Sequence, residues 1–246
     1  MIEVFHAYKN GYDTLPKLNK ISSDNFISPI SPETYKNKLD SLKKQICFTE
    51  CGITKKAYDS VNQFIKNQIQ ENDSTFYELA LKTEEDLVIQ MVGDHIDWTA
   101  ATMVCFPAGW RPEEIVGKSY LEVHKHIPMN LSNSHKLLQA CVNNGPYERF
   151  LWGLTFDESI NQHPDNKTHF DEDNICINVR VERQRIYGFP EANCFLFALK
   201  QFYIKESEID KLALINSLEN LNEAQLKYKG YNKEMIGKIK QYLLPI

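Results

Sequence analysis

The sequence lacks several features that would reveal a function directly. Its six cysteines are scattered through 246 residues without a Cys-x-x-Cys pair, so reduced thiols in the cytoplasm are expected rather than a disulfide framework or a zinc site. No apolar run is long enough to span a bilayer, and the N-terminus lacks the basic start and apolar core of a signal peptide. The net charge of -5 gives no reason to expect nucleic acid or an anionic membrane as a partner.

Signatures of several common catalytic chemistries are also missing. The sequence has no Gly-rich phosphate loop, no Ser-His-Asp order, no His-Glu-x-x-His motif, no paired-carboxylate signature and no flavin or nicotinamide fingerprint. Apolar residues nevertheless make up 42% of the chain, an ordinary globular share, and the length is sufficient for a sizeable core. These observations predict one globular unit.

Three parts are predicted within this unit. Residues 1–80 are expected to form an irregular arm and a helical cap, because Ser31-Pro32-Glu33 is typical of a helix start. Helical spacing follows it at Tyr35, Leu39, Leu42 and Ile46, and again over residues 53–70. Residues 81–205 mix strand and helix patterns, and residues 206–246 are expected to be helical.

The pattern from 86 to 204 has the strand order of a PAS domain. Two strands, DLVIQMV and ATMVCF, are joined by a turn at Gly93-Asp94, and a helix is predicted from about 132 to 143. Three further strands are predicted over 149–156, 174–186 and 193–204. The fold class expected is therefore α+β, with a five-stranded antiparallel sheet that cradles a ligand against its helices.

Residues 104–128, VCFPAGWRPEEIVGKSYLEVHKHIP, contain the densest clues to chemistry. A Pro-x-Gly turn presents Trp110, a short helix is predicted from Pro112 to Gly117, and His124 and His126 precede Pro128. A histidine near a proline is usually a loop residue with one hydrogen bond. A neutral imidazole is also a common haem-iron ligand. Both interpretations remain open from these residues alone.

Two other metal-ligand candidates lie close to this stretch. His135 is predicted on the apolar face of the following helix, together with Leu138 and Val142, where a core histidine with a satisfied hydrogen bond is the alternative. Cys105 could supply a thiolate, but its place in an apolar strand favours core packing. Trp110 and Trp152 are expected in the core or in a pocket wall.

The strand NICINVRVERQ carries unexpected charges. Alternation places Arg183 on the same face as the apolar residues Val179 and Val181. A buried arginine requires an anion or a hydrogen-bond network, so Arg183 either meets an anion or lies where the strand has left the core. Arg180 and Glu182 are on the other face and are expected to pair with neighbouring residues.

Several of these motifs occur together in one family. CFPAGWRPEEIVGK, the later VH and IP, LWGLTFDE, RVERQRIYGFP and YKG resemble the haem-dependent oxidative N-demethylase α-subunit family. The resemblance covers most of the chain. It implies a PAS-like haem protein with haem b, oxygen as oxidant, a small amine as substrate and electrons from NADPH through a separate reductase. Composition adds the expectation of a cytoplasmic location without a nucleic-acid or membrane partner, so the activity expected is that of a cytoplasmic monooxygenase.

The resemblance also implies roles for individual residues. His124 corresponds to the family histidine and becomes the expected iron ligand, with His135 and Cys105 as alternatives, and His126 replaces a family proline. A backbone carbonyl, rather than Glu122, is expected to orient its ring. The expected cofactor-binding residues are His124, Arg183, Arg180 and Trp110, and the expected substrate-pocket residues are Trp152, Glu182 and Leu151. A haem propionate is the anion expected at Arg183.

Departures from the family pattern leave other functions open. The chain differs from the usual family residues at Ala108, Leu151, Gly153, Lys200 and Phe202. Polar groups that could line the pocket are lost at several of these positions. A haem-dependent oxidase of a different, specialised substrate and a non-catalytic PAS-type haem sensor are therefore the alternatives to an N-demethylase.

Overall fold

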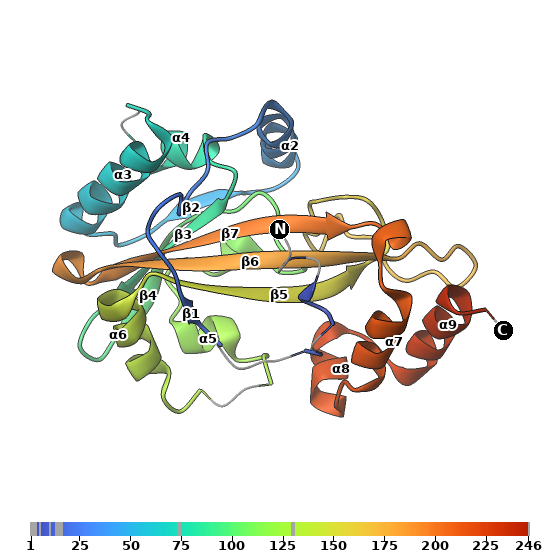
Figure 1. Cartoon of the computed structure of the whole chain (residues 1–246). Helices are drawn as coiled ribbons and strands as arrows, with labels where there is room; N and C mark the ends of the chain where they lie inside the picture. The colour runs from blue at the N-terminus through green and yellow to red at the C-terminus, as the bar shows by residue number, and fades with distance from the viewer. Residues whose placement is uncertain are drawn as a thin grey trace.

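The computed structural model describes residues 4, 6–9, 11–12, 17–72, 75–128 and 131–245. Within them, a seven-stranded antiparallel sheet has the strand order β1-β5-β6-β7-β3-β4-β2, with helices on both of its faces (Figure 1). The strands are β1 (Asn19–Lys20), β2 (Phe48–Glu50), β3 (Asp86–Val92), β4 (Asp97–Met103), β5 (Tyr147–Thr155), β6 (Asn178–Phe189) and β7 (Cys194–Ile204).

The prediction of five strands was wrong in number. The five predicted strands are β3 to β7, and two short strands extend the sheet at its edges: β1 pairs with β5, and β2 pairs with β4. Strands of two and three residues are too short to show the alternation by which a strand is detected in sequence. The class, a mixed helix and antiparallel-sheet protein, is as predicted.

The described helices surround this sheet in three groups. They are α2 (Pro32–Leu42), α3 (Lys55–Ile69), α4 (Phe76–Leu81), α5 (Tyr120–His124), α6 (Ser134–Asn144), α7 (Lys211–Glu219), α8 (Glu223–Lys229) and α9 (Lys233–Leu243). Three short 3-10 helices are η1 (Pro112–Glu114), η2 (Pro190–Ala192) and η3 (Glu206–Glu208). In Figure 1, α2–α4 lie above the sheet, α5 and α6 lie below it, and α7–α9 lie at its right-hand end.

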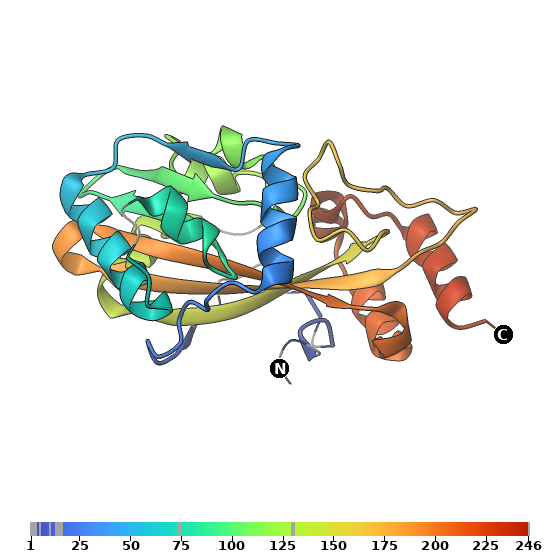
Figure 2. The same cartoon turned by 90° about the horizontal axis from the view of Figure 1, so that it is seen from above.

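Helices α2 to α4 cover one face of the sheet (Figure 2). Ser31 caps α2 as predicted, and Leu42 packs on the core, but the rest of the predicted face was wrong in part: Tyr35 is exposed, Ile46 lies exposed beyond the helix, and Lys38 is fully buried. The Lys38 ammonium donates to the carbonyls of Ala80 and Glu85, at 3.1 and 2.7 Å. It also lies 3.5 Å from the carboxylate of Asp86, and this pairing allows the charge to be buried.

Helix α6 packs on the opposite face at a glycine. Leu138, Cys141 and Val142 of α6 form a small core with Ile186 and Phe195. A Cβ at Gly188 of β6 would overlap the carbonyl oxygen of Val142 and lie 2.5 Å from that of Cys141. The close approach of α6 to β6 therefore requires glycine at this position.

The C-terminal helices and the described part of the N-terminal arm close one end of the sheet. Leu214, Ile215 and Leu218 of α7 pack with Val179 and Val181 of β6. The arm joins them, because the indole of Trp152 donates to the carbonyl of Gly11 at 2.9 Å. None of the described helices is both long and apolar enough to cross a membrane.

Candidate functional site

Polar side chains form a row across the middle of the α5–α6 face of the sheet. Cross-strand partners share a face, so the register Arg149↔Gln184, Leu151↔Glu182 and Gly153↔Arg180 places these six residues together. Gln201, opposite Glu182 on β7, joins them. Most of this row has the side-chain chemistry of a ligand site rather than of a core.

Hydrogen bonds connect the row from end to end. Arg149 donates to Gln184 at 2.5 Å, and Gln184 donates to the carboxylate of Glu182 at 2.5 Å. The second Glu182 oxygen accepts from Gln201 at 2.8 Å, and the Gln201 carbonyl oxygen accepts from Arg180 at 3.0 Å. Both carboxylate oxygens of Glu182 are thus held in place, as a preorganised polar site requires.

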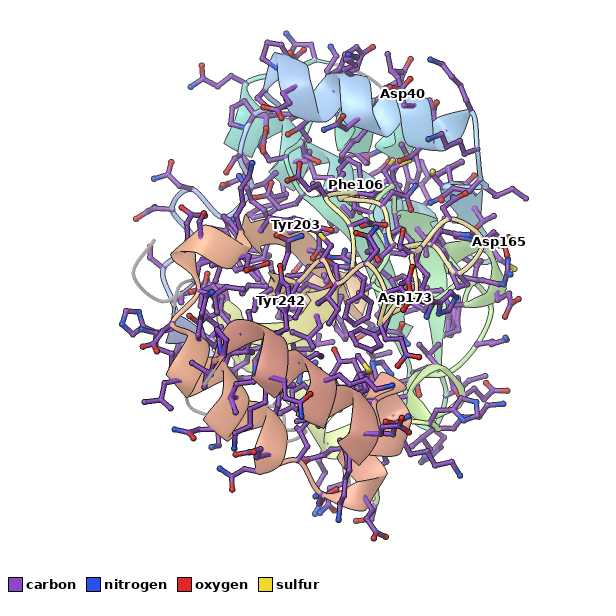
Figure 3. All side chains as sticks on the ribbon, turned by 90° about the vertical axis from the view of Figure 1, so that its right-hand side faces the viewer. Asp40, Phe106, Asp165, Asp173, Tyr203 and Tyr242 are labelled. Carbon is purple, nitrogen blue, oxygen red and sulfur yellow. The ribbon has the colours of Figure 1, made fainter. Side chains whose placement is uncertain are left out.

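Arg180 fixes the turn that follows β4. Its guanidinium donates to the carbonyls of Pro107 and Phe106, at 2.8 and 2.5 Å. Phe106 lies between α2 and the C-terminal helices, and Tyr203 is close to the same region (Figure 3). The prediction that Arg180 and Glu182 pair with neighbouring residues is confirmed, and in Arg180 this pairing accommodates a fully buried cation.

His124 ends helix α5 beside this row. Its Nδ1 lies 2.8 Å from the carbonyl oxygen of Tyr120, and its ring stacks on the Tyr120 ring with centroids 3.9 Å apart. A carbonyl can only accept, so Nδ1 carries the proton and Nε2 keeps its lone pair. The expected backbone carbonyl is therefore the partner of the ring, whereas Glu122 binds Ser119 in a capping box.

The environment keeps His124 neutral. Burial lowers the pKa of His124 to about 4, the hydrogen bond to Tyr120 opposes this shift, and the charge of Arg149 adds to it. A neutral imidazole with an oriented ring and a free Nε2 can ligate a metal ion at neutral pH. No cluster of three or more His, Cys, Asp or Glu ligands occurs in the part of the chain described, so a metal ion here would need a further ligand frame such as a porphyrin.

Arg149 is at the centre of the site. Its positive charge acts on the pKa of five surrounding groups, which belong to the arm, α5, α6 and α8: Tyr12, Tyr120, His124, Cys141 and Tyr228. Tyr12 and Tyr228 are joined by a side-chain hydrogen bond, and the negative charge of Glu182 also acts on Tyr228. The site is thus bounded by the sheet, α5, α6 and a pair of tyrosines.

Lys229 closes the outer edge of β5. Its ammonium donates to the carbonyl of Trp152 at 2.6 Å and lies 3.7 Å from the ring centroid of Tyr12 and 5.0 Å from that of Trp152. Burial lowers the pKa of Lys229 to about 7, while the two rings favour its charged form. Beside it, the Tyr231 hydroxyl accepts from the amide of Leu154 at 2.7 Å.

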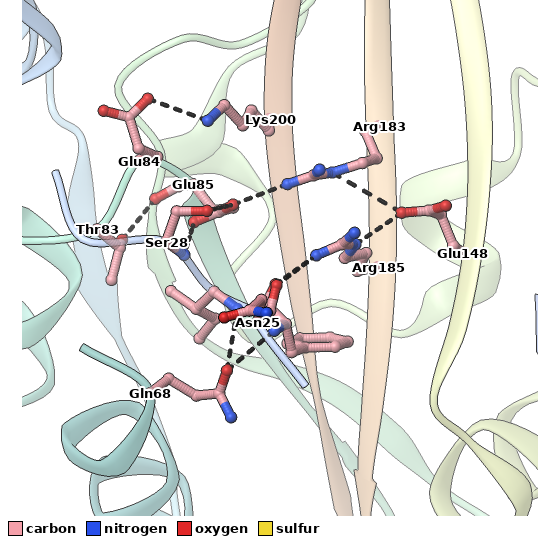
Figure 4. Close-up of polar contacts among 12 residues, drawn as sticks. Asn25, Ser28, Gln68, Thr83, Glu84, Glu85, Glu148, Arg183, Arg185 and Lys200 are labelled. Atoms are coloured by element: carbon pink, nitrogen blue, oxygen red, sulfur yellow. Dashed lines mark hydrogen bonds and ion pairs between the residues drawn. The ribbon is translucent and has the colours of Figure 1, made fainter. Parts of the chain in front are cut away.

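Arg183 lies on the other face of β6. It donates to the buried carboxylate of Glu85 at 2.9 Å and lies 3.9 Å from Glu148 (Figure 4). Neighbouring pairs are Arg185–Glu148 at 2.6 Å and Lys200–Glu84 at 3.2 Å. The anion expected at Arg183 is met within the protein, and this network is separated from His124 by the sheet. A propionate contact of Arg183 stays a prediction.

The other predicted residues are dispersed. Trp110 is half-buried at its turn, and Trp152 is buried with Val179 and Val181 on the face opposite the polar row. The prediction that His135 lies on the apolar face of its helix was wrong, because His135 is exposed while Leu138 and Val142 are buried.

Cys105 is buried in the core between the sheet and α2–α4. A hydrogen bond that the Cys105 thiol donates to Cys47, together with burial, raises the pKa of Cys105 well above the usual range. The thiol therefore stays protonated, which disfavours a thiolate ligand at this position.

Sequence reasoning missed three parts of the site: Arg149, Tyr12 and Tyr228. Alternation in RFLWG places Arg149 on the same face as Leu151, and this signal was available in the sequence. Tyr12 and Tyr228 carry no such signal, because they reach the site only through the packing of the arm and α8.

The fold and the site together define an α+β protein in which a neutral, oriented histidine lies beside a polar row on the sheet. A family model described as "Haem-dependent oxidative N-demethylase, alpha subunit-like" matches residues 31–235. The chain therefore belongs to this family, as the sequence motifs predicted. No curated protein matches the chain.

Proposed function

We propose that the protein is a haem-dependent, oxygen-using oxidoreductase that acts on a C–N bond of a small amine. The observation that carries the proposal is His124, whose neutral ring is oriented by the Tyr120 carbonyl with Nε2 left available. Membership of a family described as haem-dependent and oxidative supports it. We assign the iron ligand to His124 and the cofactor type to haem b.

The arrangement of the sheet supports a PAS-like haem pocket. Strands β3 to β7 lie in the order β4-β3-β7-β6-β5, as in the five-stranded sheet of a PAS domain, and α5 and α6 pack on one face. A haem held by His124 would lie against the polar row of β5, β6 and β7. The row would then face the haem, with Leu151 as its apolar member.

The roles of the chain's own residues follow from this placement. Haem, when bound, supplies the redox chemistry with oxygen. His124 would hold the iron, and the stacked Tyr120 fixes the plane of its ring. Glu182, held by Gln184 and Gln201, presents a carboxylate that attracts a protonated amine to the site. Electrons come from NADPH through a separate reductase in the cytoplasm.

Purification and absorbance spectroscopy test this proposal. The protein is expected to bind about one haem per chain and to show a Soret band. His124→Ala is expected to lose haem, or to give a high-spin ferric spectrum that responds to added imidazole, whereas His135→Ala keeps the wild-type spectrum. A ferrous carbonyl complex at the red-shifted position of thiolate ligation would instead assign the iron to Cys105.

The same preparation separates the alternative functions. Formaldehyde release that depends on NADPH and a reductase identifies an N-demethylase. Haem binding without oxidation of any added amine favours a sensor, and oxidation without formaldehyde favours a haem oxidase of another substrate. A protein that stays colourless after haem is added contradicts all three.

A further inference from the structure

Cations on the two faces of the sheet are paired very differently. On the face that bears Arg183, each of Arg183, Arg185 and Lys200 has a glutamate within 4.0 Å (Figure 4). Among the described residues, neither Arg149 nor Lys229 on the site side forms an ion pair. These two cations of the site side therefore lack a direct ion-pair partner in the described part of the chain.

Arg149 has free hydrogen-bonding capacity. Its Nε donates to Gln184 at 2.5 Å, which is its single hydrogen bond to the described residues. The two terminal nitrogens keep four N–H donors, and the side chain is only partly buried. Such a fork is matched geometrically by a carboxylate, which it binds through two parallel hydrogen bonds.

The ammonium group of Lys229 also has unused hydrogen-bond donors. Of three possible donors, one is used by the Trp152 carbonyl, and the rings of Tyr12 and Trp152 surround the nitrogen. No charged group contributes to its shifted pKa; burial is the one cause. Tyr12 is near both cations, because the charge of Arg149 acts on the pKa of Tyr12 and the Lys229 ammonium lies 3.7 Å from the Tyr12 ring centroid.

A negative group stands next to these cations. Glu182 is on the same face of the sheet as Arg149. Its cross-strand partner is Leu151, which is two residues after Arg149 on β5. Residues two apart on a strand face are separated by roughly 7 Å. The site thus presents a carboxylate and a guanidinium with unused donors. The spacing between them is comparable to the length of a small amino acid.

We propose that Arg149 binds a carboxylate in this site, with Lys229 further along the same edge of β5. The carboxylate comes either from a haem propionate or from an amine substrate that itself carries a carboxylate, such as an N-methylated amino acid. The inference rests on the proposed function, because both sources belong to a haem-dependent amine oxidation. With the second source, Glu182 binds the ammonium group while Arg149 binds the carboxylate.

Two titrations distinguish the sources. The first compares the uptake of haem with that of haem dimethyl ester, which has no free carboxylate. The second adds N-methylglycine or dimethylamine to the haem-loaded protein and follows the Soret band and the heat of binding. Arg149→Met and Lys229→Met are compared with wild type, and Lys227→Met at an exposed position of α8 is the surface control. Arg149→Lys keeps the positive charge but lacks the parallel N–H donors of the guanidinium.

For a propionate contact, Arg149→Met weakens haem binding about tenfold or more and leaves binding of the dimethyl ester unchanged. For a substrate carboxylate, haem binding is unchanged, and the wild type binds N-methylglycine at least tenfold more tightly than dimethylamine. That preference disappears in Arg149→Met and falls in Arg149→Lys. Thermal unfolding of each variant verifies that it remains folded.

The inference is overturned if haem and N-methylglycine both bind the Arg149 and Lys229 variants within about twofold of wild type, the scatter expected of surface substitutions. The proposed function then still stands, because haem is bound. If the wild type binds no haem, the proposed function fails. Calorimetry of N-methylglycine with that same protein then decides the inference: binding that Arg149→Met abolishes supports it, and no binding overturns it.

Discussion

At the scale of single residues, one backbone contact determines what His124 can do. The Tyr120 carbonyl fixes the proton on Nδ1, and burial disfavours the charged ring, so both effects leave Nε2 as a neutral donor of an electron pair. His126 and His135 are exposed. His124 therefore differs from its two neighbours in sequence by its partly buried position and its oriented ring.

The lowered pKa of His124 predicts how stability depends on pH. The folded value is about 4 and the ordinary value about 6.5, so between these values the unfolded chain binds more protons. Stability contributed by neutral His124 is complete above pH 6.5 and is lost as pH falls toward 4. From pH 7 to pH 5, the protein without haem is expected to lose about 2 kcal/mol that His124→Gln does not lose. Urea unfolding at both pH values measures this, and equal losses in the two proteins contradict it.

Arg183 gives a prediction about stability rather than about haem. Arg183→Met leaves the buried carboxylate of Glu85 without its cation and is expected to lower the free energy of unfolding by about 3 kcal/mol. Adding Glu85→Gln should recover part of this loss. Urea unfolding measures both effects. Haem retention poorer in Arg183→Met than in Arg180→Met would restore the propionate contact inferred from sequence.

At the scale of elements, the sequence predicted the strands and helices that have a clear periodic pattern. It missed elements that are very short and features that depend on tertiary contacts. Strand β3 was predicted with its observed bounds, Asp86–Val92, because seven residues provide a clear pattern. The cap of α2 at Ser31 is local and was also predicted. The burial of Lys38 on α2 was not, because its partners are more than forty positions away. For the site, the carbonyl partner of the His124 ring was anticipated, whereas Arg149 was missed although alternation in RFLWG places it on the face of Leu151.

Gly188 tests how α6 is positioned over the sheet. Gly188→Ala would drive a Cβ into the Cys141 and Val142 carbonyls, so we expect a loss of about 2 kcal/mol or more in unfolding free energy. Gly237→Ala on α9 is the matched control: the space around it is open, and alanine favours a helix by about 0.5–1 kcal/mol. Urea unfolding of both variants measures the difference, and equal stability would contradict the close approach.

At the scale of the whole molecule, the edge of β5 is closed by residues from both ends of the sequence. The hydroxyl of Tyr231 accepts from the Leu154 amide, and Gln225 donates to the carbonyl of Tyr12. Tyr231→Phe is expected to cost about 1 kcal/mol and to speed hydrogen exchange at Leu154, while exposed Tyr242→Phe leaves that amide unchanged. Exchange followed by mass spectrometry provides the measurement, and an unaltered Leu154 rate would show that the hydroxyl does not protect it.

This closure has a consequence for biosynthesis. The contact between Tyr12 and Gln225 spans 213 positions, so it forms only after nearly all of the chain has left the ribosome. Until then, the two tyrosines that bound the site cannot be joined, and the polar row of β5 and β6 stays accessible on that side. If the protein binds haem in this site as proposed, the haem can enter before the final helices dock, and the docking of α8 then closes that side of the site.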